Sequence, residues 1–422
     1  PIPAGTVELQ LGVKVPGASR TTVHGVLLRH HPVRPALHLA HARTLVVSSY
    51  YPSPEALYSN AFVHSRVKGY RARGERVEVF TPQSEGTSFR SFDGVEVVSA
   101  PVRELRRLLE SGAYERVGVH FLNRATWRVL REFADRVDIT VWVHGVEIQP
   151  WWRRSYVAGS PATLEQLKAK SEKRQAFWRE VLDELPDSVR FAVVSRHFLE
   201  EIEEDLGRRF PPGSVEVIHN PIDTELFAFA PKPPDQRHKV LSIRPFASGK
   251  YANDLTVAAI LELSTEPWFD ELQFRIVGDG PLFDEVTAPV SGLRNVELVR
   301  GFLSQTEIAQ LHREYGVFLV PTRMDAQGVS RDEAMASGLV PITNAVAAVP
   351  EFVDEQCGIL APAEDAHGLA DGIRRLHEDP ELFARLSVAA AERVRRQSAA
   401  DSVIPQELEL LSRARRSVES SR

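Results

Sequence analysis

Short apolar runs alternate with amphipathic segments along most of this chain. The first clear repeat lies in residues 44–82, where an apolar run, a segment of helical periodicity that ends at Gly74 and a second apolar run predict a strand, a helix and a strand. Two buried strands joined by a helix pair in parallel through a right-handed crossover. The same alternation predicts strands over 95–101, 116–123, 138–145, 190–198 and 215–223, and helices over 102–111, 126–136, 161–185 and 197–207.

A second alternation begins at residue 240, after a segment rich in proline and charge. It predicts strands over 240–246, 272–280, 296–302 and 316–322, and helices over 252–264, 281–288, 304–313, 329–337, 366–378 and 380–397. Alternation of this length is typical of parallel sheets that are covered by helices on both faces. We therefore predict an α/β protein with two Rossmann-like, doubly wound domains that face a central cleft.

Five regions are predicted from these changes in pattern. Residues 1–40 alternate like a β-hairpin and are expected to form a β-rich N-terminal extension. Residues 41–221 are expected to form an N-terminal domain, 222–238 an interdomain linker and 239–397 a C-terminal domain. Residues 398–422 are amphipathic and then charged, which favours a closing helix or tail that packs back across the interface.

The composition is that of a soluble globular protein. With 422 residues, 43% of them hydrophobic, the chain is long enough for two cores, and its net charge of −6 gives no support for nucleic acid as the main partner. The single cysteine, Cys357, excludes an internal disulfide, argues against a cysteine-based metal site and fits a reducing cytoplasm. No window is apolar enough to span a membrane and the start does not resemble a signal peptide. Because Pro1 is not preceded by Met, we expect a trimmed chain or one module of a longer protein.

Residues 320–353 hold the densest set of candidate functional side chains. An apolar run is followed there by a short predicted helix over 329–337. The first backbone N–H groups of such a helix have no partners within it and carry the positive end of its dipole, so the turn at Gly328 suits a phosphate. Asp325 lies just before that turn, and Glu333, further along the helix, can accept hydrogen bonds from sugar hydroxyls. The arrangement indicates a nucleotide-sugar site.

Six groups of residues, each at a predicted strand end, resemble the motifs of family 4 glycosyltransferases, which have the GT-B fold. In the first half these are VHG at 143–145, VVSRHF at 193–198 and HNPID at 219–223. In the second half they are IRPFASGKYAND at 243–254, IVGDGP at 276–281, and a D-x7-E pair followed by EAMASG and PE. The resemblance extends from Thr44 to Gln397 and is strongest over residues 240–353.

The resemblance implies a retaining, metal-independent enzyme that takes a sugar from a nucleoside-diphosphate sugar. Arg244 and Lys250 would stabilise the charge that develops on the pyrophosphate, the arginine as a planar fork and the lysine as a point charge. Glu333 would bind the ribose hydroxyls and Asp325 would face the donor sugar. His144, at the carboxyl end of a predicted strand, would hydrogen-bond the donor sugar or the reaction intermediate.

The candidate catalytic residues are therefore His144, Asp325, Arg244 and Lys250. The candidate donor-binding residues are Arg244, Lys250, Gly278, Gly328, Val329 and Glu333. No metal or other cofactor is expected. The N-terminal domain would serve the acceptor and the C-terminal domain the donor.

Three features depart from the family's usual pattern. Position 325 is Asp where the family usually has Glu, and the shorter carboxylate can still accept hydrogen bonds. The first strand is not followed by paired glycines, so either Ser59 and Asn60 take their place at the helix start or this loop serves the acceptor. Ala347 and Ala348 stand where two glycines are common; a positive φ would be strained there, so a different loop shape is expected.

Three further features are less specific. Glu351, in the PE pattern, is a candidate site residue by resemblance alone. The sequence WWRR at 151–154 either contacts an acceptor sugar or an anionic lipid surface, or packs under a loop. Residues 102–111 are basic and amphipathic, and either rest on a membrane or form a solvated helix against the sheet.

The expected function is transfer of a hexose-type sugar from a nucleoside-diphosphate sugar to a hydroxyl of a glycan or lipid-linked glycan, as in bacterial cell-surface polysaccharide biosynthesis. The expected location is the cytoplasm, with peripheral contact at the inner face of the membrane. Two alternatives stay open: a non-catalytic GT-B module that binds carbohydrate or nucleotide, and a sugar-nucleotide epimerase of the same fold. The sequence does not fix the donor sugar, base, acceptor, linkage or oligomeric state.

Overall fold

The computed structural model describes residues 35–54, 56, 59–157 and 161–412. The strand-like runs of the β-rich extension expected over residues 1–40 lie outside this range, and Pro35–His38, near its end, forms a short helix, α1. The tail beyond residue 412 also lies outside the described residues. The chain divides into two compact units, Pro1–Ile139 and Thr140–Arg422.

The first unit contains a parallel sheet whose inner strands are buried. Strand β1 (Thr44–Ser48) pairs in parallel with β2 (Val77–Pro82) and with β5 (Arg116–His120). All residues of β1 are buried, as expected for a strand that is covered on both faces. The helices of this unit include α2 (Ala61–Ala72), α3 (Val102–Glu110) and α4 (Arg124–Leu130), as the pattern predicted.

A hairpin at the edge of this sheet is absent from the predicted elements. Strand β3 (Ser88–Phe92) runs antiparallel to β4 (Val95–Ala100). The two residues between them, Asp93 and Gly94, have positive φ values of 48° and 70°, which is what the Asp-Gly type I′ hairpin turn requires. Because β3 is largely exposed, it lacks the continuous apolar run by which the other strands were found.

Strand β6 (Asp138–Val143) crosses the boundary between the units, and the strand order is β3-β4-β2-β1-β5-β6-β7-β8. In the second unit β7 (Val189–Val193) and β8 (Val215–Val217) pair in parallel. Two predicted helices lie in this stretch, α5 (Pro161–Asp183) and α6 (Arg196–Leu206).

The second sheet is entirely parallel, with strands in the order β11-β10-β9-β12-β13-β14. Its strands are β9 (Lys239–Ile243), β10 (Gln273–Gly278), β11 (Val296–Arg300), β12 (Val317–Leu319), β13 (Val340–Asn344) and β14 (Ile359–Ala361). The chain starts at β9, builds outward to β11 and then returns to β12 on the other side of β9. Ligands of such sheets bind beyond the carboxyl ends of the strands where the order reverses, here between β9 and β12.

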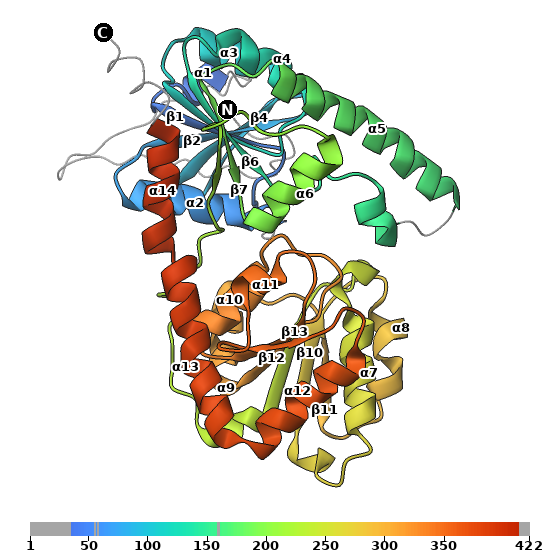
Figure 1. The fold of residues 1–422 in the computed structure, drawn as a ribbon. Coiled ribbons are helices and arrows are strands. Elements are labelled where there is room, and N and C mark those ends of the chain that lie inside the picture. Colours follow the sequence, from blue (N-terminus) through green and yellow to red (C-terminus); the bar gives the residue numbers. More distant parts are fainter. Residues whose placement is uncertain (1–34, 55, 57–58, 158–160, 413–422) are drawn as a thin grey trace, which may run out of the picture. The chain divides into compact units, whose positions relative to one another are not determined.

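The two sheets, parallel apart from the edge strand β3, confirm the predicted α/β fold class, although β13 and β14 were not among the predicted strands. The helices of this part are α7 (Asn253–Leu263), α8 (Phe283–Thr287), α9 (Gln305–Glu314), α10 (Val329–Ala336), α11 (Val349–Phe352), α12 (Ala366–Glu378) and α13 (Pro380–Gln397). Helix α12 lies close against the sheet (Figure 1), because Gly372 leaves room for the side chains of Ile342 and Ile359, which a β-carbon would approach to 3.1 and 3.0 Å.

The closing helix expected near the C-terminus is present as α14 (Ala400–Ser412). Just before it, the backbone of Ile222 accepts a hydrogen bond from Ala400 over 2.9 Å and donates one to Ser398 over 2.8 Å. Within α14 the buried Glu407 accepts a hydrogen bond from Trp142 Nε1 over 3.2 Å. These contacts attach the end of the chain to β6 and to the segment after β8.

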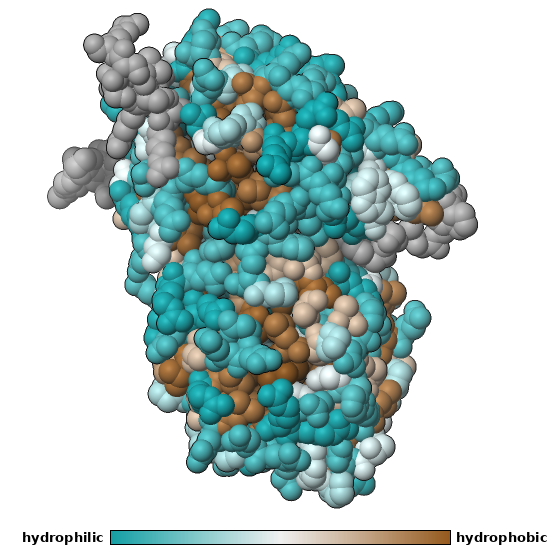
Figure 2. Space-filling model, in the orientation of Figure 1, coloured by the Kyte–Doolittle hydropathy of each residue, from teal (hydrophilic) through white to brown (hydrophobic). Residues whose placement is uncertain are grey.

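The face seen in Figure 2 is mainly hydrophilic, and its hydrophobic side chains gather in limited patches. Among the described residues, every helix is too short or too polar to serve as a membrane span.

Candidate functional site

Helix α10 begins at the carboxyl edge of the second sheet, shortly after β12. Gly328 precedes its first residue, Val329, with a φ of 102°, and no side chain caps this end in the described part of the chain. A β-carbon at position 328 would lie 2.8 Å from the guanidinium of Arg331, so the position needs glycine for space as well as for conformation. The uncapped N–H groups form the kind of helix end that binds phosphate.

Arg244 follows β9 directly and is buried, with 6% of its surface exposed. Its Nη1 donates to Ser330 Oγ in α10 over 3.3 Å, and its guanidinium lies 5.1 Å from the ring centre of Tyr251. Nε is buried and has no hydrogen-bond partner among the described residues. Burial lowers the pKa of Arg244, an effect that the carboxylate of Asp325 opposes.

Lys250 lies nearby in a short turn and is half-buried. Burial lowers the pKa of its ammonium group; Asp325 opposes this shift, whereas the charges of Arg244 and Arg154 add to it. In the part of the chain that the structure describes, no carboxylate lies within ion-pair distance of Arg244 or Lys250. The structure therefore brings together two cations that have no direct counter-ion among the residues it describes.

Asp325 lies in the loop between β12 and α10, half-buried, and its Oδ1 accepts a long hydrogen bond from the Gln327 N–H, 3.3 Å. Its backbone oxygen accepts from Ala348 N–H over 3.2 Å. Its charge acts on both Arg244 and Lys250. The predicted group of Asp325, Arg244 and Lys250 is thus gathered around the start of α10.

Glu333 lies on α10, half-buried, and its Oε1 accepts from Gln305 Nε2 over 3.3 Å. Burial raises the pKa of Glu333 to about 8, and repulsion from Asp332 and Asp223 adds to the shift. A carboxyl group of this kind becomes ionised at little cost when hydroxyl groups donate hydrogen bonds to it. The placement fits the predicted role in binding a sugar.

Close packing explains why position 278 is a glycine, and the sequence did not show this. A β-carbon there would lie 1.9 Å from the backbone oxygen of Arg244 and 2.8 Å from the ring of Phe246. Glycine at the end of β10 therefore lets the segment that carries Arg244 pass alongside. Direct contact of Gly278 with a ligand stays a prediction.

His144 stands at the end of β6, half-buried, in a loop that α5 holds in place. The backbone N–H of His144 donates to Glu147 Oε1 over 2.7 Å, and Trp178 of α5 donates to the Glu147 carbonyl over 2.6 Å. Gln149, further along this loop, approaches Sδ of Met324 to 3.9 Å with its Nε2, next to Asp325. The loops of His144 and Asp325 are therefore neighbours.

Glu147 is a residue that the sequence analysis did not single out. Burial raises the pKa of its carboxyl to about 7, and the His144 N–H bond opposes the rise. Its Oε2 is buried without a hydrogen-bond partner among the described residues. In the sequence, the only sign that Glu147 belongs to this region is its position three residues after His144.

Glu351, which was carried over by resemblance alone, contacts the start of α6. Its Oε2 accepts from the Arg196 N–H over 3.0 Å and its Oε1 accepts from the His197 N–H. These are the first two residues of α6, so Glu351 caps that helix.

The alanine loop keeps the backbone conformation that glycine favours. Ala347 has a φ of 46° and Ala348 a φ of −80°, so the expected change of shape is absent at the first position and the chain carries the strain instead. In the first unit Asn60 precedes α2 with a φ of 54°, and its side chain donates to the Tyr50 carbonyl over 3.2 Å. Asn60 thus supplies the left-handed residue that glycine would provide.

Residues 151–154 and 102–111, which had two interpretations each, form ion pairs within the protein. Arg153 pairs with Glu201 and Asp205 at 3.0 and 2.6 Å, whereas Trp152 is 51% exposed. In α3 the leucines are buried and Arg106 pairs with Glu132. These contacts favour packing over lipid binding for Arg153 and for α3.

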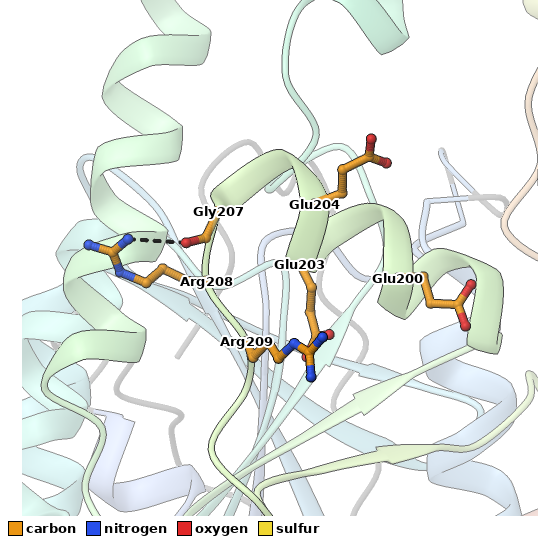
Figure 3. A pocket seen from close by; sticks show the side chains of 6 residues that line it. All are labelled: Glu200, Glu203, Glu204, Gly207, Arg208 and Arg209. Atoms are coloured by element: carbon orange, nitrogen blue, oxygen red, sulfur yellow. Dashed lines mark hydrogen bonds between the residues drawn. The ribbon is translucent and has the colours of Figure 1, made fainter.

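An open surface pocket of ≈ 460 Å³ lies at the end of α6 (Figure 3). It is lined by Glu200, Glu203, Glu204, Gly207, Arg208 and Arg209. Arg208 reaches back to the Gly207 carbonyl over 3.1 Å. None of the candidate site residues lines this pocket.

Two family models match successive parts of the chain. One, described as glycosyl transferases group 1, matches residues 238–379, and the other, glycosyltransferase family 4, matches residues 59–226. Together they cover well over half of the sequence, including all the candidate site residues.

Individual relatives are more distant. N-acetyl-α-D-glucosaminyl L-malate synthase of Bacillus anthracis is 27% identical over 168 residues, 40% of this chain and 43% of that protein. The chain matches less than half of the length of the curated relatives.

Solved structures match more of the fold. Sucrose-phosphate synthase of Thermosynechococcus elongatus has a TM-score of 0.67 at 16% identity, over 90% of this chain and 100% of that one. HepE of Anabaena, in complex with UDP and glucose, has a TM-score of 0.64 at 15% identity, over 88% of this chain and 100% of that one. At these identities the likeness shows the fold, which confirms the predicted GT-B class.

Proposed function

Because this chain belongs to the group 1, family 4 glycosyltransferases, we propose that it transfers a hexose-type sugar from a nucleoside-diphosphate sugar to a hydroxyl of a glycan or lipid-linked glycan. The setting that we propose for this reaction is bacterial cell-surface polysaccharide biosynthesis. A lipid-linked acceptor would bring the protein to the inner face of the membrane.

The observation that carries the proposal is the pair of desolvated cations, Arg244 and Lys250, beside the uncapped start of α10. Burying positive charge without a partner is costly, and a ligand with two negative charges offsets that cost. The N–H groups at Gly328 and Val329 add donors on the same side. A pyrophosphate meets these requirements, and a nucleotide-sugar presents one.

The chemistry follows from where charge develops. The bond between the anomeric carbon and the phosphate oxygen breaks, and its electron pair stays on the pyrophosphate. Arg244 and Lys250 stabilise that charge in a site of low polarity, the task that a metal ion performs in other transferases. We infer that the reaction needs no metal.

Retention of configuration follows if the acceptor hydroxyl attacks from the face that the phosphate leaves. The hydroxyl proton then passes to the departing phosphate oxygen, so no protein base is required. His144 and Asp325 lie in neighbouring loops and are proposed to hold the sugar between them. Glu333 is proposed to bind the ribose hydroxyls.

The test is a panel of nucleotide-sugars and their diphosphates, scored by the melting temperature and by sugar release and transfer. At a hundredfold excess over the dissociation constant, a ligand stabilises the folded state by about 2.7 kcal/mol. We expect one diphosphate to raise the melting temperature and the matching sugar to be transferred with retention, also in EDTA. If no nucleotide binds, the proposal fails.

Lys250→Ala should weaken that binding by roughly tenfold or more, since a desolvated charge contact is lost. Lys170→Ala is the matched control, because Lys170 is exposed on α5. Equal affinity of the two variants would contradict the assignment of the phosphate site.

A second candidate, a binding module without turnover, is favoured by Asp325 in place of the usual glutamate. Binding of a diphosphate with no release or transfer from any donor would support it. Conversion of a nucleotide-sugar into its epimer would support the epimerase instead.

A further inference from the structure

Two histidines and a glutamate converge at the edge of the second sheet that lies opposite Arg244. His238 precedes β9, Glu271 precedes β10 and His377 lies in the last turn of α12. Because β9 and β10 are parallel, residues just before them share the amino edge of the sheet, whereas Arg244 follows β9 at the carboxyl edge. Strand β9 separates the two places by roughly 17 Å.

The spacing of the side chains matches a coordination sphere. One potential ligand atom from each of the three residues lies within 4.8 Å of the others. Nδ1 of His377 and Nε2 of His238 are 3.1 Å apart. Two nitrogens bound to one tetrahedral zinc ion at about 2.05 Å lie about 3.3 Å from each other. Small rotations of the two rings would therefore let both nitrogens bind one ion, in place of the proton that they share without it.

The surrounding residues hold the rings in this arrangement. Trp268 stacks on His377 with ring centres 4.0 Å apart at 12°, and Arg237 Nε donates to the His377 carbonyl over 3.1 Å. Burial lowers the pKa of His238, and the charge of Arg237 adds to the shift. Glu271 is exposed, which leaves a side open to water as a further ligand.

We propose that His238, His377 and Glu271 form a binding site for a divalent transition metal of the zinc class. Imidazole nitrogens with a single carboxylate suit Zn²⁺ and other divalent ions of the first transition row, whereas Mg²⁺ and Ca²⁺ prefer oxygen ligands. The ion links the segments before β9 and β10 to the end of α12, so it stabilises the fold. It lies at the far end of β9 from Arg244 and takes no part in sugar transfer, so this proposal is independent of the proposed function.

The experiment uses the full chain, without a histidine tag, after treatment with EDTA. Calorimetric titration with ZnCl₂ is expected to give one ion per chain, and zinc to raise the melting temperature by a few degrees. MgCl₂ at the same concentration should do neither. His238→Ala and His377→Ala should each weaken zinc binding at least by the roughly tenfold seen for outer-shell changes.

Two further variants keep the test clear if a histidine variant folds poorly. Glu271→Gln changes only an exposed side chain and should still weaken binding. His367→Ala is the matched control, because His367 is exposed and pairs with Glu262 at 2.7 Å, away from the three proposed ligands; it should bind zinc like the wild type. The proposal is overturned if the wild type shows no saturable zinc binding, or if Glu271→Gln and the histidine variants bind as tightly as the control.

Discussion

The side-chain amide of Gln327 forms two hydrogen bonds with the backbone of Asn220: Nε2 donates to the carbonyl over 3.2 Å, and Oε1 accepts from the N–H over 2.5 Å. The same Nε2 donates to Oδ2 of the buried Asp332 over 3.0 Å. Gln327 is only 1% exposed, so water cannot replace these bonds. The loop that carries Asp325 is thereby attached to the HNPID segment after β8.

Gln327→Ala should lower the free energy of unfolding by about 2–3 kcal/mol, because it leaves buried polar partners unpaired. Urea denaturation followed by circular dichroism measures this. Gln406→Ala, at an exposed site of α14, is the control and should change stability by less than about 0.5 kcal/mol. Equal stability of the two variants would show that the Gln327 bonds contribute little.

Glu351→Ala should destabilise the protein by about 1–2 kcal/mol, because it removes a charged cap from the start of α6. The affinity for a nucleoside diphosphate should change little, since both carboxylate oxygens are engaged by α6. Denaturation and calorimetric titration separate the two effects. Glu355→Ala, at an exposed position four residues before β14 begins, serves as the control. A loss of affinity at unchanged stability would instead make Glu351 a ligand contact.

Most of both sheets was predictable because parallel strands buried on two faces appear as continuous apolar runs. β13 was missed although all five of its residues are buried, because it contains Pro341, which counts against a central strand in a sequence. β3 has no buried residue and was also missed; the Asp93-Gly94 turn that follows it is the signal that could have revealed it. β14 has three residues, too few for a pattern.

The family resemblance indicated Arg244, Lys250 and Asp325, and the structure places the three near one another; their roles stay a prediction. What the sequence could not show are contacts between distant segments, because spacing along the chain carries no information about them. The cap that Glu351 gives to Arg196 joins residues 155 positions apart. The bond of Gln327 to Asn220 spans 107 positions.

Asp325→Asn is expected to strengthen binding of the nucleoside diphosphate while it weakens sugar transfer. The charge of Asp325 acts on Arg244 and Lys250, so its removal leaves both cations free to attract phosphate. One charge removed at a partly buried site corresponds to a gain of roughly threefold to tenfold. Titration calorimetry and initial transfer rates measure the two effects. Asp371→Asn, exposed on α12, is the control. Weaker diphosphate binding in Asp325→Asn would contradict this prediction and would mean that the carboxylate contributes to binding, as an acceptor for ligand hydroxyl groups does.

Donor binding should become tighter as the pH rises toward 8, and Glu333 is the reason. Burial raises the pKa of Glu333 to about 8 in the free protein. Ribose hydroxyls that donate to the carboxylate favour its ionised form, so the complex binds fewer protons than the free protein. By linkage, affinity then increases with pH below the raised pKa, by at most about tenfold per pH unit, and levels off above it.

An intact nucleotide-sugar is the right ligand for this measurement, because its pyrophosphate does not titrate in this range, whereas the terminal phosphate of a free diphosphate has a pKa near ~6. Titrations from pH 6 to 9 should show the rise in the wild type and in Glu378→Gln, whose side chain is exposed on α12. Glu333→Gln cannot ionise, so its affinity should be low and independent of pH. A wild-type affinity that falls as the pH rises would mean that protonated Glu333 donates to the ligand, which reverses the direction of the hydrogen bond proposed for the ribose.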